Sequence, residues 1–358
     1  NILVEGKGDG CIDSRRHDID VLRVSALLLL IVYHAAISFQ RFAPYIAFPQ
    51  NGELLEWLMI PGSLVNIWRI PILYVISGMA LVFSFQRYEV KRVIRQRLIR
   101  IGFPLVGGWL VVGPVGFCLS QLFYGKEISY ALNPLHLWFL NNIIVYILAG
   151  SFLYYFFFQS SHGRINRISR RIFGSIYGLF VTLFFGIAEG FLLNPEVYVW
   201  FINGAHGWSI GFICFMLGML YANSGKKFWR VVSRLRMFTF LTAIVLYLFR
   251  LFEYRLEKVP SYLLGIESML WIWAILGFGH LFLNRDSSLI NYLRSAVFPV
   301  YILHQPIQYM LAFVIFPLDI FPSLKFLLLV LSVLIVSFGF YQFILRRIEV
   351  VKLFFGIR

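Results

Sequence analysis

Arg15-Arg16-His17-Asp18-Ile19-Asp20-Val21-Leu22-Arg23 leads directly into an apolar run, residues 24–39, which carries a single histidine, His34. A run of this length and composition predicts a helix that crosses a lipid bilayer. Eleven positions separate Arg23 from His34, which is about three turns of an α-helix. The two side chains should therefore face the same way, roughly 16 Å apart along the helix axis. We expect this helix to present an anion-binding group and a titratable base to one cavity.

The composition excludes a soluble globular domain. Hydrophobic residues make up 59% of the 358 residues and charged residues only 14%, against about a quarter charged in typical soluble domains. The formal net charge is +15, but the basic residues lie in short loops between apolar runs, where orientation in a bilayer explains them. The sequence therefore predicts a polytopic membrane protein in contact with lipid, without a nucleic-acid partner.

About ten apolar runs approach the roughly 20 residues that a spanning helix needs. They are residues 21–39, 62–85, 101–123, 136–158, 172–193, 207–223, 237–252, 262–283, 297–317 and 323–345. The run 237–252 is the shortest of them. Together they predict an all-α fold, a polytopic membrane helix bundle of about ten transmembrane helices.

Lysine and arginine alternate between the loops, which predicts the orientation of the chain. Basic clusters occur at residues 15–16, 87–100, 164–171, 226–236, 285–294 and 346–358. Loops poor in basic residues are 40–61, 124–135, 194–206 and 318–322. The positive-inside rule then places both termini in the cytoplasm, although the mixed loop 253–261 argues neither way.

The chain shows one unit of organisation after its first residues. Residues 1–14 are polar and glycine-rich, and we expect them to form a flexible cytosolic leader. Residues 15–358 are expected to form a single transmembrane domain, because no loop is long enough for another. Three cysteines, Cys11, Cys118 and Cys214, lack the spacing of metal ligands, so the sequence predicts no metal site.

Several stretches, taken in order, resemble one known family. Arginine followed by ten residues and histidine on the first membrane helix resembles the signature of the membrane-bound acyltransferase-3 family, and residues 15–23 are similar to the opening segment of its glucan-modifying branch. Four later stretches are also similar: Arg69-Ile70-Pro71 with Ile76-Ser77-Gly78, Arg97-Leu98-Ile99-Arg100, His136-Leu137-Trp138-Phe139-Leu140 and Tyr301-Ile302-Leu303-His304-Gln305-Pro306. The resemblance covers nearly the whole chain.

The resemblance implies an O-acyltransferase in a bacterial inner (cytoplasmic) membrane. Its partners would be acyl-CoA, used as the donor substrate with no cofactor bound permanently, and a carbohydrate acceptor. The acyl group, acetyl, succinyl or similar, would pass from cytosolic acyl-CoA to a hydroxyl of an envelope or exported carbohydrate. The sequence does not reveal the acyl group, the acceptor, whether an acyl-enzyme forms, or whether the protein is a homo-oligomer.

His34 and Arg23 are the candidate catalytic residues. An ionisable group inside a bilayer costs about 2.5–3.5 kcal/mol on insertion scales, which makes it a functional candidate by default. A neutral imidazole at His34 can take a proton from an attacking hydroxyl; the alternative is a buried histidine bonded to a carbonyl. For Arg23, the alternative is a basic anchor whose head reaches the interface.

Arg97 and Arg100 are the candidate donor-binding residues. They lie three positions apart, on one helical face. The resemblance implies that they contact the phosphates of acyl-CoA, and the planar guanidinium suits bidentate binding of phosphate oxygens. The alternative is a solvated cluster that only orients the helix.

A set of side chains expected near the outer face could line the acceptor site. The candidate substrate-binding residues are Arg69, His136, Trp138, Glu267 and His304. Simple hydration at the interface is the alternative for this set. For His304 the alternative is to satisfy a carbonyl freed by Pro306, which lacks an N–H.

A proton-coupled secondary transporter of an organic anion is the competing hypothesis. In that case Arg23, Arg97 and Arg100 would bind the solute and His34 would relay protons. Such transporters usually have two similar halves, and we find no convincing internal symmetry in this sequence.

Overall fold

The structure is a computed structural model, and it describes residues 16–158, 163–202 and 204–357. The expected leader, residues 1–14, lies outside them. Helices account for all the regular secondary structure of these residues. In the first half they are α1 (His17–Ile37), α2 (Met59–Phe85), α3 (Val90–Gly107), α4 (Gly113–Phe123), α5 (Trp138–Leu153) and α6 (Arg164–Phe173). In the second half they are α7 (Tyr177–Leu193), α8 (Ala205–Ser224), α9 (Lys226–Glu253), α10 (Ser261–Phe282), α11 (Ser288–Ile315), α12 (Pro322–Phe340) and α13 (Glu349–Phe354).

Short 3₁₀ and π segments extend or connect these helices. The 3₁₀ turns are η1 (Ala43–Ile46), η2 (Glu56–Leu58) and η4 (Leu135–Leu137), and the π segments are η3 (Gly108–Val112), η5 (Tyr154–Phe158) and η6 (Tyr341–Leu345). Because η3 joins α3 to α4 without a break, residues Val90–Phe123 form one span.

Within the described ranges, nine helical spans are long and apolar enough to cross a membrane, or up to ten if the bent pair α6 and α7 counts as one. This confirms the predicted all-α bundle of about ten transmembrane helices. The protein is a multi-pass membrane protein. The cytoplasmic location of both termini stays a prediction.

Two runs differ from the sequence expectation in extent. The short run 237–252 belongs to α9, which begins at Lys226 and has 28 residues, because its basic first turns are helical although they are not apolar. The run 172–193 is broken, and α6 and α7 meet at an angle of 93°. Hydropathy alone marks the apolar part of a helix, not where its backbone begins or bends.

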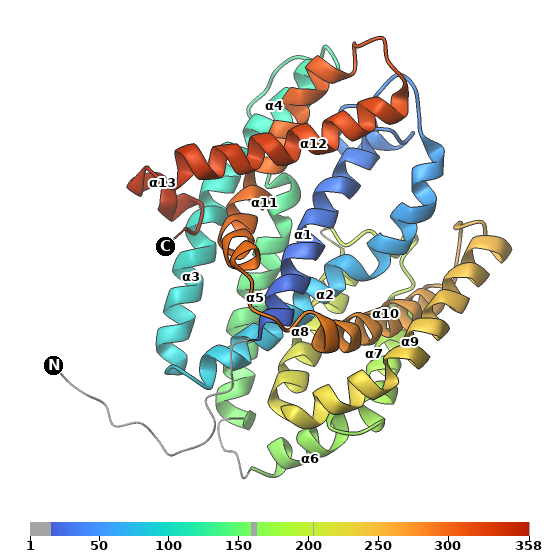
Figure 1. Cartoon of the computed structure of the whole chain (residues 1–358), viewed down its shortest axis with the longest axis vertical. Coiled ribbons are helices and arrows are strands. Elements are labelled where there is room, and N and C mark those ends of the chain that lie inside the picture. Colours follow the sequence, from blue (N-terminus) through green and yellow to red (C-terminus); the bar gives the residue numbers. More distant parts are fainter. Residues whose placement is uncertain (1–15, 159–162, 203, 358) are drawn as a thin grey trace.

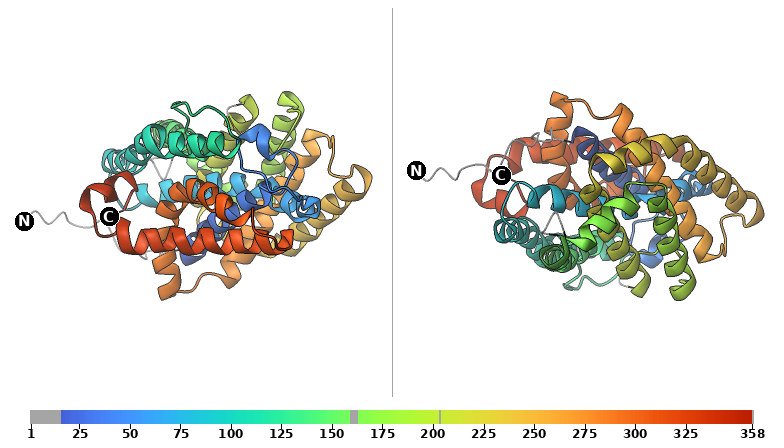
Figure 2. Two further views of the ribbon diagram at one scale, coloured as in Figure 1. Left: turned by 90° about the horizontal axis from the view of Figure 1, so that it is seen from above. Right: turned by 90° about the horizontal axis from the view of Figure 1, so that it is seen from below.

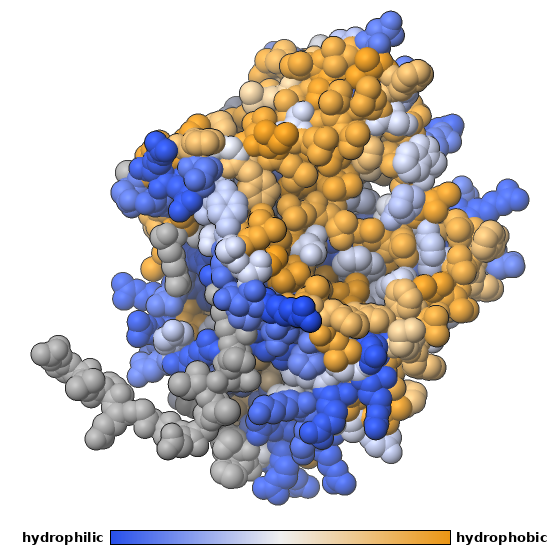
Figure 3. Space-filling model, in the orientation of Figure 1, coloured by the Kyte–Doolittle hydropathy of each residue, from blue (hydrophilic) through white to orange (hydrophobic). Residues whose placement is uncertain are grey.

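α1 lies inside the bundle, in contact with α2, α10, α11 and α12 (Figure 1). The views from above and below place α13 and the connection from α9 to α10 at opposite ends of the molecule (Figure 2). Hydrophobic residues cover most of the face shown in Figure 3, and hydrophilic residues gather toward its lower part. Such a band of apolar surface is expected where lipid surrounds the protein.

Glycines allow α2 and α8 to approach closely. A Cβ atom placed on Gly78 would lie 2.0 Å from the carbonyl oxygen of Phe215, and one on Gly218 would lie 2.0 Å from that of Val75. No other residue type fits this reciprocal contact, and small residues at helix interfaces are the usual means of close packing in membranes. The contact fixes α2, which carries Arg69, against the rest of the bundle.

The segment between α1 and α2 folds back over the end of α1. The N–H groups of Asn51 and Leu55 donate to the carbonyls of Ser38 and Phe39, at 2.8 and 3.0 Å. Phe48 in this segment is buried and contacts the ring of His34 edge to face, with centroids 5.4 Å apart. This cover lies directly beside the candidate base.

Candidate active site

Three histidines from three separate elements meet at one place. His34 lies in the last turn of α1, His136 in η4 and His304 in the middle of α11. Nδ1 of His34 lies 2.9 Å from Nε2 of His304. The ring of His136 is 4.7 Å from that of His304 and 6.4 Å from that of His34 between centroids. The structure thus brings together three of the predicted site residues.

The hydrogen bonds determine where the protons of these rings lie. Nδ1 of His304 is 2.6 Å from the carbonyl oxygen of Tyr301, and because a carbonyl only accepts, this nitrogen carries the proton. Nε2 of a neutral His304 is then an acceptor, so the bond to His34 is donated by Nδ1–H of His34. Nε2 of His34 is left with a free lone pair. This is the tautomer in which an imidazole can accept a proton through Nε2.

Burial distinguishes the two bonded rings. His304 is fully buried, whereas His34 is only partly buried. His34 is therefore the less buried residue of the bonded pair. Gln308, one turn after His304, donates to the carbonyl of His34 at 2.9 Å and to the hydroxyl of Ser38 at 3.1 Å. These bonds hold the end of α1 against α11 and so fix the position of His34.

His136 is held to α11 by a reciprocal pair of hydrogen bonds. Its Nε2–H donates to the carbonyl oxygen of Tyr301 at 2.8 Å, and the hydroxyl of Tyr301 donates to the carbonyl of His136 at 2.7 Å. Nδ1 of His136 has no hydrogen-bond partner among the described residues. Trp138 follows it at the start of α5, and its side chain is buried in the core.

Arg69 lies in the middle of α2 and is almost completely buried, with 1% of its surface exposed. Its Nη2 donates to the side-chain oxygen of Asn66 at 3.0 Å, and its guanidinium lies 4.2 Å from the ring centre of Tyr33. The amide of Asn66 also donates to the hydroxyl of Tyr33 at 2.9 Å. Because Tyr33 precedes His34, these contacts place Arg69 beside the histidine cluster, and its charge acts on both His34 and His304.

The hydrogen-bond ladder of α2 is interrupted close to Arg69. Pro71 lies inside the helix and lacks the N–H that would bond to the carbonyl of Ile67. The hydroxyl of Ser268, on α10, donates to that carbonyl at 2.9 Å. The segment around Arg69 is thus tied to a neighbouring helix at the point where its own ladder is interrupted.

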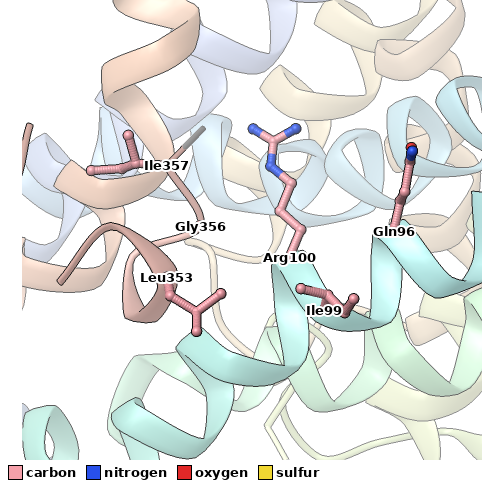
Figure 4. Close-up of a pocket in the computed structure, with 6 residues that line it drawn as sticks. All are labelled: Gln96, Ile99, Arg100, Leu353, Gly356 and Ile357. Atoms are coloured by element: carbon pink, nitrogen blue, oxygen red, sulfur yellow. The ribbon is translucent and has the colours of Figure 1, made fainter. Parts of the chain in front are cut away.

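Arg97 and Arg100 occupy different environments on α3. Nη2 of Arg97 donates to the carbonyl of Ala80 and the hydroxyl of Ser84 on α2, both at 3.1 Å. Arg100 is exposed and lines a pocket of about 240 Å³. Figure 4 shows α3 on one side of this pocket and the segment that follows α13, with Gly356 and Ile357, on the other. Neither arginine belongs to the histidine cluster.

Arg23 lies near the beginning of α1, far along the helix from His34. Its Nη1 is 3.8 Å from Oδ1 of Asp20, and Oδ2 of Asp20 is 3.9 Å from Nε of Arg294 on α11. One third of the Arg23 side chain is exposed. Three charges of two helices therefore meet at this end, which leaves Arg23 in a position to attract an anion but not to touch the reacting atoms at His34.

Glu267 forms an ion pair with Arg250, a residue that the sequence did not single out. Its carboxylate lies 2.9 and 3.0 Å from Nε and Nη2 of Arg250, on α9, and both side chains are buried. Trp271 donates to the same carboxylate at 3.4 Å. A buried ion pair of this kind links α9 to α10. The role of Glu267 as an acceptor ligand stays a prediction.

Sequence reasoning missed the contacts of Tyr301 and Gln308 with the histidine cluster, and the ion pair of Arg250 with Glu267. Tyr301 and Gln308 lie three residues before and four after His304, on the same face of α11, so helical spacing around that histidine could have revealed them. For Arg250 the signal was an arginine within an apolar run, whose cost in a membrane calls for a partner.

These spans, with three histidines clustered among them, describe a multi-pass membrane protein. The family model described as an acyltransferase domain, that of the acyltransferase-3 family, matches residues 16–342. The chain belongs to this family and is an O-acyltransferase. This membership favours the enzyme over the transporter hypothesis.

The chain is also similar to curated proteins. It is 23% identical over 330 residues to "Glucans biosynthesis protein C" of Escherichia coli O1:K1, and 21% identical over 347 residues to the protein of that name in Salmonella paratyphi A. Each comparison covers 82% of this chain and 82% of the relative. No solved structure matches the chain.

Proposed function

We propose that this protein transfers an acyl group from cytosolic acyl-CoA to a hydroxyl of an envelope or exported carbohydrate. The observation that carries the proposal is the bond between His34 and His304, which leaves Nε2 of His34 free to accept a proton. A base is what an alcohol needs to attack a thioester at neutral pH.

The chemical step follows from this arrangement. The acceptor hydroxyl approaches the thioester carbonyl while Nε2 of His34 removes its proton. The new C–O bond forms a tetrahedral intermediate, the C–S bond then breaks, and the thiolate of CoA takes the proton from His34. His304 holds the ring of His34 in place through the 2.9 Å bond to Nδ1.

The donor is proposed to enter from the side of Arg100, in the cytosol. CoA carries several phosphates and cannot cross the bilayer, whereas its thin pantetheine arm can reach inward. Arg100 beside the 240 Å³ pocket supplies a guanidinium for phosphate, with Arg97 next to it and Arg23 as a further cation. The distance between Arg23 and His34 along α1, roughly 16 Å by helical rise, suits an extended arm.

The acceptor is proposed to be a glucan or related carbohydrate. Support comes from the relatives whose printed name is "Glucans biosynthesis protein C", and from the position of His34 near the end of α1 opposite to Arg23. His136 and Trp138 at the start of α5 are the proposed acceptor side of the site. We propose a bacterial inner membrane as the location, with both termini cytosolic and residues 15–358 as one domain.

The proposal is tested with purified protein in vesicles. Acyl-CoA labelled in the acyl group is supplied on one side and a β-glucan on the other, and label is measured in the carbohydrate after the donor is removed. Label in ester linkage to the glucan supports the proposal. Turnover of the donor without labelled glucan, while another hydroxyl compound becomes labelled, contradicts the proposed acceptor, and no consumption of acyl-CoA contradicts the proposed donor.

A further inference from the structure

Arg69 combines deep burial with an incomplete set of partners. Of its nitrogens, Nη2 bonds to Asn66, whereas Nε and Nη1 have no hydrogen-bond partner among the described residues. A guanidinium has five N–H donors and no means of becoming neutral in a protein. A buried charge that lacks an anion is costly, so its persistence calls for an anion that is present at some stage of function.

A second buried arginine has a carboxylate as its partner. Arg250 is also buried, and two of its nitrogens face the two carboxylate oxygens of Glu267. Among the residues that the structure describes, no carboxylate contacts Arg69; its neighbours are the amide of Asn66 and the ring of Tyr33. Of these two buried arginines, Arg250 therefore has a carboxylate partner, whereas Arg69 lacks one and lies beside the histidine cluster.

We infer that Arg69 stabilises the oxyanion that forms on the thioester carbonyl during acyl transfer. The inference rests on the proposed function. As the acceptor oxygen bonds to the carbonyl carbon, the π electrons move to the carbonyl oxygen, and the proton of the acceptor moves to His34. The negative oxygen is then paired with Nε and Nη1 of Arg69, and the electrons return when the C–S bond breaks and the thiolate leaves.

The charges of the site agree with this assignment. Before the reaction, Arg69 is a cation beside a neutral His34. In the intermediate, His34 is an imidazolium, and the oxyanion between the two cations compensates the added charge. A fixed donor that meets charge only as it develops is the arrangement that accelerates reactions most, because it needs no reorganisation at that moment.

The test compares Arg69→Gln with the wild type in three measurements: kcat for transfer, the Kd of a non-reactive thioether analogue of acyl-CoA, and Tm. We expect kcat to fall by roughly 10²–10³, the usual loss for one oxyanion donor. The Kd should stay within about a factor of two and Tm should not fall, because the variant removes an unpaired charge. The matched control is Arg250→Gln, which leaves Glu267 buried without its partner and should lower Tm.

Several results would overturn the inference. Unchanged kcat in Arg69→Gln would remove Arg69 from the reaction, and a higher Kd with normal kcat at saturating donor would make it a ground-state anion site. Loss of activity only with donors whose acyl group ends in a carboxylate would assign Arg69 to that carboxylate. If Arg69→Gln fails to fold, Arg69→Lys replaces it as the test because it keeps the positive charge. Its kcat should lie between that of the wild type and the value expected for Arg69→Gln. A wild-type kcat in Arg69→Lys would contradict a role for the two-nitrogen geometry of the guanidinium.

Failure of the proposed function gives a different pattern. In that case the wild type itself transfers nothing from acyl-CoA, whereas failure of this inference leaves the wild type active and only the Arg69 variants unexpected.

Discussion

Nδ1 of His34 lies 2.9 Å from Nε2 of His304, although 270 positions separate the two residues in the chain. The bond links the last turn of α1 to the middle of α11, and the carbonyl of Tyr301 fixes its direction. Its consequence is chemical: the less buried histidine of the pair keeps its lone pair on Nε2.

This relationship makes His304 a positioning residue. His304→Ala should lower the transfer rate by up to about 10²-fold, the loss expected when a catalytic group is misplaced by about 1 Å, while the Kd for acyl-CoA stays the same. His304→Gln offers an amide oxygen to Nδ1–H of His34 and should recover part of the rate. Equal losses in both variants, together with a lower Tm, would instead indicate that His304 serves only packing.

The helices could be predicted from the sequence because each spanning helix has its own apolar run. The apolar run after Arg23, for example, predicts a span without reference to any other residue. Sequence reasoning also located His34, His136 and His304 singly, through cost in the membrane and family resemblance. It could not predict that they share one site, since their contacts depend on how α1, η4 and α11 pack.

The same reason explains why the sequence does not reveal the partner of Glu267. The sequence alone does not show whether a buried glutamate such as Glu267 binds a substrate or pairs with another side chain of the protein. Only the packing of α9 against α10 shows that Arg250 occupies its carboxylate. Likewise, the difference between the paired Arg250 and the unpaired Arg69 exists only in three dimensions.

The donor site makes a second prediction. Arg100→Ala should weaken acyl-CoA binding by about 1.5–3 kcal/mol, the usual size for hydrogen bonds to charged groups. Arg100→Lys keeps the positive charge but not the fork geometry of the guanidinium, so it should recover only part of the lost binding free energy. Arg97→Ala should also lower Tm, since it removes the bonds to Ala80 and Ser84. Titration of an acyl-CoA analogue measures the affinity.

The control for that experiment is Ser84→Ala, which removes only one partner of Arg97 and leaves both guanidinium groups in place. If a folded Arg97→Ala, Arg100→Ala double variant binds acyl-CoA as the wild type does, these arginines serve orientation in the membrane and not donor binding.

The contact between α2 and α8 gives a prediction about stability. Gly78→Ala would place a Cβ atom 2.0 Å from the carbonyl oxygen of Phe215, so the helices must separate. We expect a loss of about 1–3 kcal/mol in the free energy of unfolding, as is typical of overpacking. The matched control is Gly102→Ala on α3, where no described atom beyond the neighbouring helix backbone lies within 4 Å of the added carbon and the change should be neutral or stabilising. Similar stability of the two variants would contradict the close helix contact.

The orientation of the chain is open to a direct test. The positive-inside rule predicts that the loop around Lys126 faces outward and that the beginning of α9, near Arg230, faces the cytosol. Reporter fusions active on only one side of the membrane should therefore give opposite signals at these two points. The same signal at both would mean that an odd number of the intervening helices does not cross.

The central claim, that His34 is the general base, is tested most directly by measuring acyl transfer and donor binding on purified His34→Ala. The account predicts that the variant folds and binds acyl-CoA with nearly the wild-type Kd, because the proposed phosphate contacts lie elsewhere, near Arg100. Its transfer rate should fall by roughly 10²–10⁴, the contribution of a positioned base. A transfer rate close to that of the wild type would contradict the account.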